Sequence, residues 1–320
     1  MPPPGPTGTA TGRALFVGVD GGGTHTIALA GRDGGSVVGR GETGPSNPSA
    51  LGFDRATAAI VEAVRGALAG IGDAAPARIT MGVAGAGRPA DARRLGELVA
   101  AGLGLPAERI RVLQDVALLL PAAGLSSGVA LVAGTGSSAF GVAPDGRTAT
   151  AGGWGYLLGD EGSAFFVGRE ALIAVARADD GTGRPTALTG ATLRHFGVET
   201  PRDLITAIYQ SGHPRAAIAD LAPTVVETAR GGDPIGGEIL ALGARELGRC
   251  AIALTRRLGL RDPALVAVGG MFRAGALVLD PLAAELATAG LRPPQVLAAE
   301  PALGALRLAA GELPEPRPPS

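Results

Sequence analysis

Two segments of this chain join an apolar stretch to a turn of glycine and hydroxyl residues, a combination that binds phosphate. The first is LFVGVDGGGTHT, residues 15–26, and the second is VALVAGTGSS, residues 129–138. Glycines let consecutive backbone N–H groups point at one anion with no Cβ in the way, and Thr and Ser hydroxyls add donors. Two such turns predict a nucleotide held between two lobes.

Asp20 ends the first apolar segment and precedes three glycines, so we expect its carboxylate at the first turn. There it would give Mg²⁺ an oxygen ligand, directly or through water. The alternative is an Asp that caps the turn by accepting backbone N–H groups. The presence of the second glycine-rich turn favours the metal role.

Asp115 stands between an expected strand, Ile110–Leu113, and an apolar helix-like stretch, Val116–Ala123. A carboxylate at such a corner is ordinarily a helix N-cap. The other interpretation is a general base that projects into the cleft. Sequence position alone favours the cap.

The only tryptophan, Trp154, lies in the segment GGWGYLLGDEGS, residues 152–163. A flat aromatic among glycines and beside carboxylates suits the apolar face of a sugar ring, with carboxylates accepting its hydroxyls. Asp160, Glu161 and Ser163 could also simply open a helix. The two interpretations are compatible.

All 28 basic residues are arginine, because the chain contains no lysine. This excludes P-loop ATPases, protein kinases and Schiff-base enzymes, each of which requires a lysine. Phosphate must therefore be neutralised by backbone, arginine or a metal ion.

The remaining reactive side chains do not form a site. His25, His195 and His213 are far apart in sequence, which argues against zinc. Cys250 lies in a helical apolar pattern and is expected to be a small core residue. Residues 134–139, GTGSSA, fit the dinucleotide pattern G-x-G-x-x-A, but a strand follows where that motif requires a helix, so we reject it.

The elements that must position these residues follow from apolar spacing and turn residues. In the first half we expect a strand hairpin followed by alternating helices and strands. The ranges after the first turn are strands Ile27–Ala30 and Ser36–Gly39 with the turn Asp33-Gly34-Gly35, helix Asp54–Ala69, strand Ile79–Val83, helix Ala92–Gly102 and strand Ile110–Leu113. Such an order forms a mixed sheet with helices on its faces.

The second half repeats this order, which predicts an α/β fold of two similar lobes, each a mixed sheet flanked by helices. The ranges are the two strands and turn within Val129–Val142, helices Ser163–Arg177, Pro201–Gln210, His213–Arg230 and Gly236–Leu258, strand Leu265–Val268 and helix Ala274–Ala289. We place the N-terminal lobe at 13–121, with a C-terminal helix at 300–312 returning to it, and the C-terminal lobe at 122–299. A disordered leader, 1–12, and a tail, 313–320, complete the expected organisation.

Composition indicates a cytoplasmic enzyme acting on a small molecule. The net charge is −1 over 320 residues, which gives no basic face for nucleic acid. No apolar run approaches the roughly 18 residues of a membrane span, and the first twelve residues do not resemble a signal peptide.

Taken together, these motifs resemble the actin-like ATPase superfamily and, within it, the BadF/BadG/BcrA/BcrD ATPase family, which contains the N-acetylglucosamine kinases. The resemblance extends from Gly18 to about Ala310, and its most specific part is Gly153–Ser163. It implies an actin-like (ribonuclease H-like) fold, ATP and Mg²⁺ as cofactors, and a homodimer. It also makes Asp115 the catalytic base instead of a cap.

The resemblance assigns the other sites residue by residue. They are Asp20 for the metal, Gly22, Gly23, Thr24, Thr135, Gly136, Ser137, Gly269 and Gly270 for ATP, and Asn47, Gly153, Trp154, Asp160, Ser163 and Ser138 for the sugar. Ser138 departs from the animal-type kinases, which carry Asn directly after the GTGS turn, so contacts near the sugar are expected to differ.

The function implied is ATP-dependent phosphorylation of the 6-hydroxyl of an amino sugar, first of all N-acetylglucosamine, with glucosamine or N-acetylmuramic acid as alternatives. A rival from the same family is the ATPase activator of a radical dehydratase, but its iron–sulfur cluster needs more than one cysteine. A regulator that binds sugar without phosphorylating it would leave the two phosphate turns unexplained.

Overall fold

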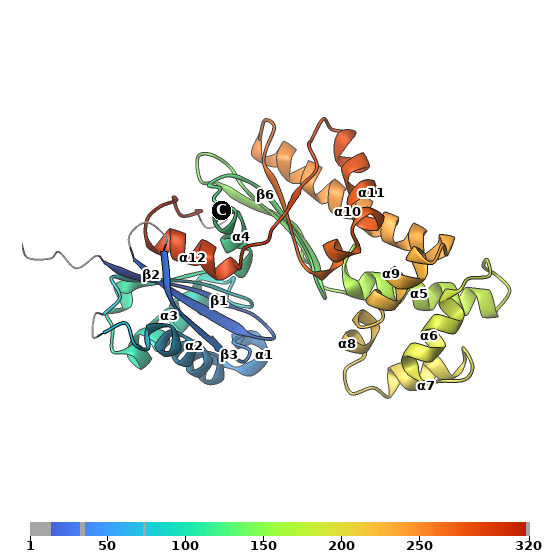
Figure 1. Ribbon diagram of the computed structural model, residues 1–320, viewed down its shortest axis with the longest axis horizontal. Helices are drawn as coiled ribbons and strands as arrows, with labels where there is room; N and C mark the ends of the chain where they lie inside the picture. The colour runs from blue at the N-terminus through green and yellow to red at the C-terminus, as the bar shows by residue number, and fades with distance from the viewer. Residues whose placement is uncertain (1–13, 33–35, 73–74, 318–320) are drawn as a thin grey trace, which may run out of the picture. The chain divides into compact units, whose positions relative to one another are not determined.

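The computed structural model describes residues 14–32, 36–72 and 75–317, and the chain divides into two compact units. The first unit comprises the chain up to Gly124 together with Ala299–Pro314, and the second comprises Leu125–Ala298 and the residues from Glu315 on. Figure 1 shows their elements along the chain. The expected leader, 1–12, and the expected turn at Asp33-Gly34-Gly35 lie outside the described residues.

The first unit is built on a five-stranded mixed sheet with the order β3-β2-β1-β4-β5. Strands β1 to β3 form an antiparallel meander, and β4 and β5 run parallel to β1. The strands are β1 Leu15–Gly21, β2 Thr26–Arg32, β3 Ser36–Thr43, β4 Arg78–Val83 and β5 Ile110–Leu113. The helices are α1 Pro48–Leu51, α2 Phe53–Leu68, α3 Pro89–Leu103, α4 Leu119–Ala122 and α12 Pro301–Ala309, with 3₁₀ turns η1 Ala107–Arg109 and η2 Asp115–Leu118.

Both faces of this sheet are covered because successive side chains of β1 point to opposite sides. Val17 and Val19 belong to the apolar core formed with α2 and α3. Phe16 packs in a separate cluster with Leu306 of α12. Figure 1 shows α12 on the side of the sheet away from α2 and α3. A segment from the end of the chain therefore completes the unit that contains its beginning.

The second unit repeats the topology of the first. Its sheet has the order β10-β9-β6-β7-β8, with an antiparallel meander β6 to β8 and with β9 and β10 parallel to β6. The strands are β6 Gly128–Ala133, β7 Ser137–Val142, β8 Thr148–Gly152, β9 Leu265–Val268 and β10 Gln295–Val296. The predicted fold class, a repeated mixed sheet flanked by helices, is confirmed.

Helices supply most of the remaining mass of the second unit, and α10 packs against β7 and β8. They are α5 Ala164–Asp179, α6 Leu188–Phe196, α7 Asp203–Tyr209, α8 Pro214–Ala219, α9 Ala222–Arg230, α10 Pro234–Leu258 and α11 Ala276–Ala287, with the 3₁₀ turn η3 Gly270–Ala274. Cys250 lies on α10, half-buried and packed against the core, as expected of a structural thiol.

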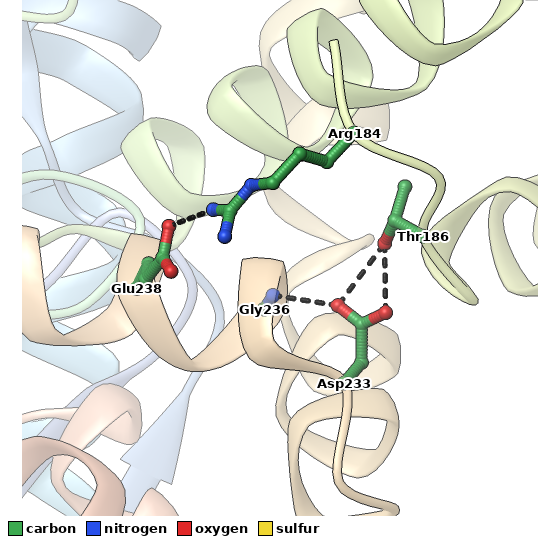
Figure 2. A network of polar contacts seen from close by, with 5 residues as sticks. All are labelled: Arg184, Thr186, Asp233, Gly236 and Glu238. Atoms are coloured by element: carbon green, nitrogen blue, oxygen red, sulfur yellow. Dashed lines mark hydrogen bonds and ion pairs between the residues drawn. The ribbon is translucent and has the colours of Figure 1, made fainter.

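The start of α10 is fixed by Asp233, the N-cap residue (Figure 2). Its carboxylate accepts the N–H of Gly236 at 2.8 Å, the N–H of Ala187 at 2.8 Å and the hydroxyl of Thr186 at 2.9 Å. The same side chain thus satisfies a helix end and ties it to the chain entering α6. Nearby, Arg184 and Glu238 form an ion pair in which both side chains are largely exposed.

The sequence prediction was wrong over His213–Arg230, which we expected to be one helix. The structure has α8 and α9 there, separated at Asp220 and Leu221. Pro223 explains the break, because a proline inside a continuous helix would lack an N–H and clash with the preceding turn. In α9 it occupies the first turn, where no hydrogen bond is lost.

Residues 313–320, expected to be a tail, include a segment held by the second unit. The N–H of Arg317 donates to the carbonyl of Gly146 at 2.9 Å, and its own carbonyl accepts from the hydroxyl of Thr148 at 2.9 Å. Among the described residues, no helix is both long and apolar enough to cross a membrane.

Candidate active site

The turn after β1 presents unused backbone donors. Its shape is fixed by two hydrogen bonds, from Gly22 N–H to the carbonyl of His25 and from Ser46 N–H to the carbonyl of Gly22, each 3.0 Å. Gly23 and Thr24 are exposed, and among the described residues their N–H groups have no hydrogen-bond partner. Adjacent free N–H groups at a turn suit an anion.

Asp20 and Asp115 form the electrostatic centre of the first unit. Burial, together with the negative charge of Asp115, raises the pKa of Asp20 to about 6, while His25 opposes the rise. Burial also raises the pKa of Asp115, although backbone N–H groups of Val116 and of Asp115 itself counteract it. Two partly desolvated carboxylates near each other favour a bound cation or a shared proton.

Asp115 lies at the start of η2, where both a cap and a general base were considered from the sequence. The N-cap position of η2 belongs to Gln114, whose own side chain makes no capping bond, while the carboxylate of Asp115 interacts with the N–H groups of Val116 and of Asp115 itself. Asp115 is the first residue of that turn, directly after β5. A half-buried carboxylate with a raised pKa near the carboxyl end of a strand has the properties of a general base.

Asp20 fits the Mg²⁺ that the resemblance implies, since its half-buried carboxylate lies at the first turn. Mg²⁺ in nucleotide enzymes is typically held by one or two carboxylates together with phosphate oxygens and waters. Asp20 provides one such carboxylate, and the free N–H groups of Gly23 and Thr24 follow it closely in the chain. No cluster of three or more His, Cys, Asp or Glu side chains occurs in the described part of the chain, so a metal cage made by protein alone is not present there.

Asn47 lies at the N-terminus of α1, in the same unit. Its side-chain oxygen accepts the N–H groups of Ser49 at 2.9 Å and Ala50 at 3.3 Å. Its amide NH₂ group has no partner among the residues that the structure describes and remains available to a ligand. The two hydrogen bonds that its oxygen accepts therefore fix the direction in which the NH₂ group of Asn47 points.

The second turn, between β6 and β7, is closed by a bond from Gly134 N–H to the carbonyl of Gly136 at 2.9 Å. Thr135 is exposed at its tip, and within the described ranges the N–H groups of Thr135 and Gly136 have no partner. Ser137 is anchored instead, since its hydroxyl donates to the carbonyl of Glu161 at 2.7 Å. Both turns thus leave two neighbouring donors free.

Asp160 is the most constrained residue near this turn. It is a buried non-glycine residue at φ +65°, a backbone region that L side chains rarely adopt. One carboxylate oxygen accepts the N–H of Ser137 at 3.3 Å, and the other pairs with Arg215 at 3.3 Å. Strain of this kind persists only where the surroundings determine it, and it gathers at functional sites.

The residues of the second unit that are assigned to the sugar lie near Asp160 in the chain but differ in exposure. Ser163 is fully buried, and its hydroxyl caps α5 by accepting the N–H of Phe166 at 3.1 Å. Gly153 donates its N–H to the carbonyl of Ser137, and a Cβ at Gly153 would lie 3.3 Å from the Cβ of Ser138. Trp154 is 74% exposed, so its ring face is free for a ligand.

A pocket of about 600 Å³ opens between the second turn and η3, a volume suited to a nucleoside. It is lined by Gly134, Thr135, Ala164, Ala219, Asp220, Ala222, Pro223, Val226, Glu227, Arg230, Gly270, Met271, Arg273 and Ala274. Thr135 and Gly270, assigned separately from the sequence, are thus brought together. Gly269 lies at φ +123°, and a Cβ there would stand 2.2 Å from the carbonyl oxygen of Ala133, so only glycine allows β9 to turn at this point.

Sequence reasoning missed the arginines of the second unit. Arg230 and Arg273 line the pocket, and the guanidinium of Arg230 donates to the carbonyl of Arg273 at 3.2 Å. Arg215 reaches Asp160 from 55 residues away in sequence. No local pattern marks these residues, because tertiary contacts alone bring them to the site.

Two repeated sheets, each with a glycine-rich turn at the end of its first strand, define an actin-like ATPase fold. The chain belongs to the BadF/BadG/BcrA/BcrD ATPase family, whose model matches residues 17–309.

Two relatives that match most of this chain are named as amino sugar kinases. The N-acetylmuramic acid/N-acetylglucosamine kinase of Clostridium acetobutylicum is 29% identical over 254 residues, which cover 78% of this chain and 82% of that protein. The N-acetyl-D-glucosamine kinase of Dictyostelium discoideum is 29% identical over 282 residues, which cover 83% and 88%.

A solved structure assigned as an N-acetylglucosamine kinase of Chromobacterium violaceum is 29% identical, with a TM-score of 0.73 over 93% of this chain and 99% of that one. A ROK family glucokinase from Streptomyces griseus shares the fold, with a TM-score of 0.55 at 21% identity over 93% and 100% of the two chains.

Proposed function

We propose that this protein is an ATP-dependent kinase that phosphorylates the 6-hydroxyl of an amino sugar, N-acetylglucosamine above all. The observation that carries the proposal is the half-buried pair Asp20 and Asp115, both with raised pKa values, in a chain of this ATPase family. Relatives named as N-acetylglucosamine kinases support the sugar class. The pair matters because phosphoryl transfer needs one carboxylate beside the metal and another to take the proton of the hydroxyl.

In this proposal Asp115 accepts the proton of the 6-hydroxyl as that oxygen attacks the γ-phosphorus of ATP in line. The bond from the γ-phosphorus to the bridging oxygen breaks, and ADP leaves. Asp20, together with the phosphates, would hold Mg²⁺, which would supply positive charge to the transferring group. The free N–H groups of Gly23, Thr24 and Thr135 donate to phosphate oxygens, a role that a lysine-free chain must give to backbone.

The second unit supplies the nucleoside pocket and the sugar contacts in this scheme. Arg273 and Gly270 lie where the adenosine would bind. Asp160 accepts sugar hydroxyls, and Trp154 faces the apolar side of the ring. We further propose a cytoplasmic homodimer, which light scattering after size exclusion would test by its mass.

The test is ADP release with Mg·ATP and each of N-acetylglucosamine, N-acetylmuramic acid, glucosamine and glucose, with product mass measured in parallel. We expect sugar-dependent turnover that is fastest with N-acetylglucosamine. N-acetylmuramic acid is the second candidate, because the Clostridium acetobutylicum relative is named for both sugars. Absence of sugar-dependent ADP release with all four would reject the kinase proposal.

A further inference from the structure

Arg215 is held in one place by two different neighbours. Its guanidinium carbon lies 5.1 Å from the ring centroid of Tyr156, within the range of a cation–π contact. Tyr156 in turn packs edge-on against Phe165 of α5, with 5.1 Å between ring centroids. On its other side the guanidinium meets the carboxylate of Asp160 at 3.3 Å. These contacts link α8 to the loop that carries Trp154.

The second turn is shaped to admit this ion pair. A Cβ at Gly136 would stand 2.8 Å from Oδ2 of Asp160 and 3.2 Å from Nη2 of Arg215. The absence of a side chain at Gly136 therefore lets the carboxylate and the guanidinium both reach the turn. Three groups from separate segments, the turn, the loop and α8, meet at this point.

Asp160 keeps acceptor capacity in spite of these contacts. A carboxylate offers about four lone-pair positions, and the structure uses one on each oxygen, for Ser137 and for Arg215. Both contacts are long at 3.3 Å, so each oxygen can also accept a ligand hydroxyl. The Asp160 side chain is only 4% exposed, whereas Arg215 is 45% exposed. A ligand therefore reaches Asp160 past the guanidinium.

The geometry points to Arg215 as the positioning residue for the sugar acceptor: it holds the Asp160 carboxylate in place and aims it at the ligand, and so it sets sugar affinity. This inference rests on the proposed function for the identity of the ligand, an amino sugar. Without Arg215 the carboxylate of Asp160 would be buried with no cationic partner, a state that is costly and that a protein relieves by turning the group toward another partner.

Sugar affinity can be measured without turnover because Trp154 is the only tryptophan and lies in the same loop as Asp160. Intrinsic fluorescence of the full-length protein, titrated with N-acetylglucosamine, reports the sugar Kd. We expect Arg215→Ala to raise that Kd about 10-fold or more, the usual effect of losing a bond to a charged group. The Kd for ATP should rise less than the sugar Kd, and an equal or larger rise for ATP would mean that Arg215 acts on the phosphates at the second turn and would overturn the inference.

Two further variants keep the test valid if Arg215→Ala folds poorly. Arg215→Gln retains length and an amide donor, and it should give a smaller rise than Ala. Arg215→Lys retains charge but loses the planar stacking on Tyr156. Its sugar Kd should lie between those of wild type and Arg215→Gln. Arg184→Ala, which breaks an exposed ion pair with Glu238 in the same unit, is the matched control and should leave both Kd values unchanged.

A double-mutant cycle separates positioning from direct contact. In an Asp160→Asn background, Arg215→Ala should change the sugar Kd by less than about twofold, because the residue through which it acts is already altered. Equal effects in both backgrounds would overturn the inference and mean that Arg215 touches the ligand itself. An unchanged sugar Kd in folded Arg215→Ala would overturn it as well.

The outcomes for the kinase proposal are distinct. A wild-type protein that binds the sugar by fluorescence but releases no ADP would reject the kinase and leave the positioning role to be decided by the Kd series. A wild-type protein that neither binds nor phosphorylates any of the four sugars would overturn both.

Discussion

Gly18 of β1 lies directly against the backbone of Leu306 in α12, so that a Cβ on Gly18 would stand 2.1 Å from the Leu306 nitrogen. Because the obstacle is backbone, it cannot move aside as a side chain could. Gly18→Ala should therefore force α12 off the sheet and cost about 3 kcal/mol or more. Thermal unfolding followed by circular dichroism measures this loss.

Gly237→Ala in α10 is the matched control. No atom lies within 4 Å of a Cβ at that position. The same substitution there should stabilise the protein by up to about 1 kcal/mol, since alanine is the better helix former. Similar effects at both sites would contradict the close packing of α12 on β1.

Asp233 should contribute measurably to stability, in contrast to the ion pair beside it in Figure 2. Burial raises its pKa, but hydrogen bonds from Gly236, Ala187, Thr186 and Ile235 outweigh burial and hold the pKa below its usual value. Asp233→Ala should cost about 1 to 2 kcal/mol near neutral pH. Chemical denaturation at pH 7 measures the difference.

The sign of the pH dependence follows from that lowered pKa. The stabilisation is complete above the ordinary Asp pKa and is lost as the pH falls through the lower folded-state value. The difference in the free energy of unfolding between wild type and Asp233→Ala should therefore become smaller in acid. Glu238→Gln, which removes the exposed partner of Arg184, should change stability by less than about 0.5 kcal/mol. A larger loss of stability in Glu238→Gln than in Asp233→Ala would contradict this prediction.

Asp115→Asn should abolish most turnover while leaving the nucleotide bound. Loss of a general base typically lowers kcat by about 10² to 10⁴. The substitution keeps the size of the side chain, so the Kd for ATP should remain within about twofold. Steady-state ADP release and an ATP titration of the same preparation test both statements, and unchanged kcat would remove Asp115 from the mechanism.

Asp20 should destabilise the metal-free protein above pH 6. Its pKa is raised to about 6, so the folded state binds a proton more tightly than the unfolded state does. Stability from this group is present in acid and is lost as the pH rises from about 4 through 6. Asp20→Asn should therefore raise the Tm at pH 7 in the presence of a chelator, whereas the exposed Glu97→Gln should not.

With Mg²⁺ and ATP present, the Tm at pH 7 should instead be higher for wild type than for Asp20→Asn. Metal binding requires the ionised carboxylate, so the ligands should raise the Tm of wild type at pH 7 more than that of Asp20→Asn. The difference should shrink below pH 6, where protons compete with the metal. Equal ligand stabilisation of the two proteins at pH 7 would place the metal elsewhere.

Trp154→Ala should weaken sugar binding with no effect on the fold. The ring is 74% exposed, so its removal should alter stability by less than about 0.5 kcal/mol. An aromatic contact is worth about 0.5 to 1.5 kcal/mol, which corresponds to a sugar KM about 2- to 12-fold higher. Leu157→Ala, 79% exposed in the same loop, should leave KM unchanged. Kinetics with N-acetylglucosamine compare the two variants.

Local sequence was enough to predict the strand and the glycine-rich turn at each of the two phosphate-binding turns. The strands before Asp20 and Gly134 are apolar runs that stop at glycine, so both the strand and the turn could be predicted from a few neighbouring residues. The repeated order of elements could be predicted for the same reason. Helix α6 and strand β8 were not predicted, because polar and small residues blur their periodicity.

The contacts between segments could not be predicted in this way. The pairing of Asp160 with Arg215 depends on where α8 packs, and that position depends on the break at Pro223 that the sequence analysis overlooked. Ser163 illustrates a residue for which two interpretations were compatible in sequence, and the structure gives it the geometry of a helix cap. The roles of individual residues in sugar and nucleotide binding remain predictions for the variants above.

The return of α12 to the first sheet also orders events during synthesis. The first unit is interrupted after Gly124 and resumes at Ala299, so the ribosome makes residues Leu125–Ala298 of the second unit before the first unit has its last helix. At the usual rates of about 5 to 20 residues per second, the 190 residues from Gly124 to Pro314 (314 − 124) correspond to roughly 10 to 40 seconds. During that interval the face of β1 around Phe16 and Gly18 has no cover from its own chain. In the nascent protein, the uncovered sheet face of the first unit is therefore the part most open to chaperones or to aggregation.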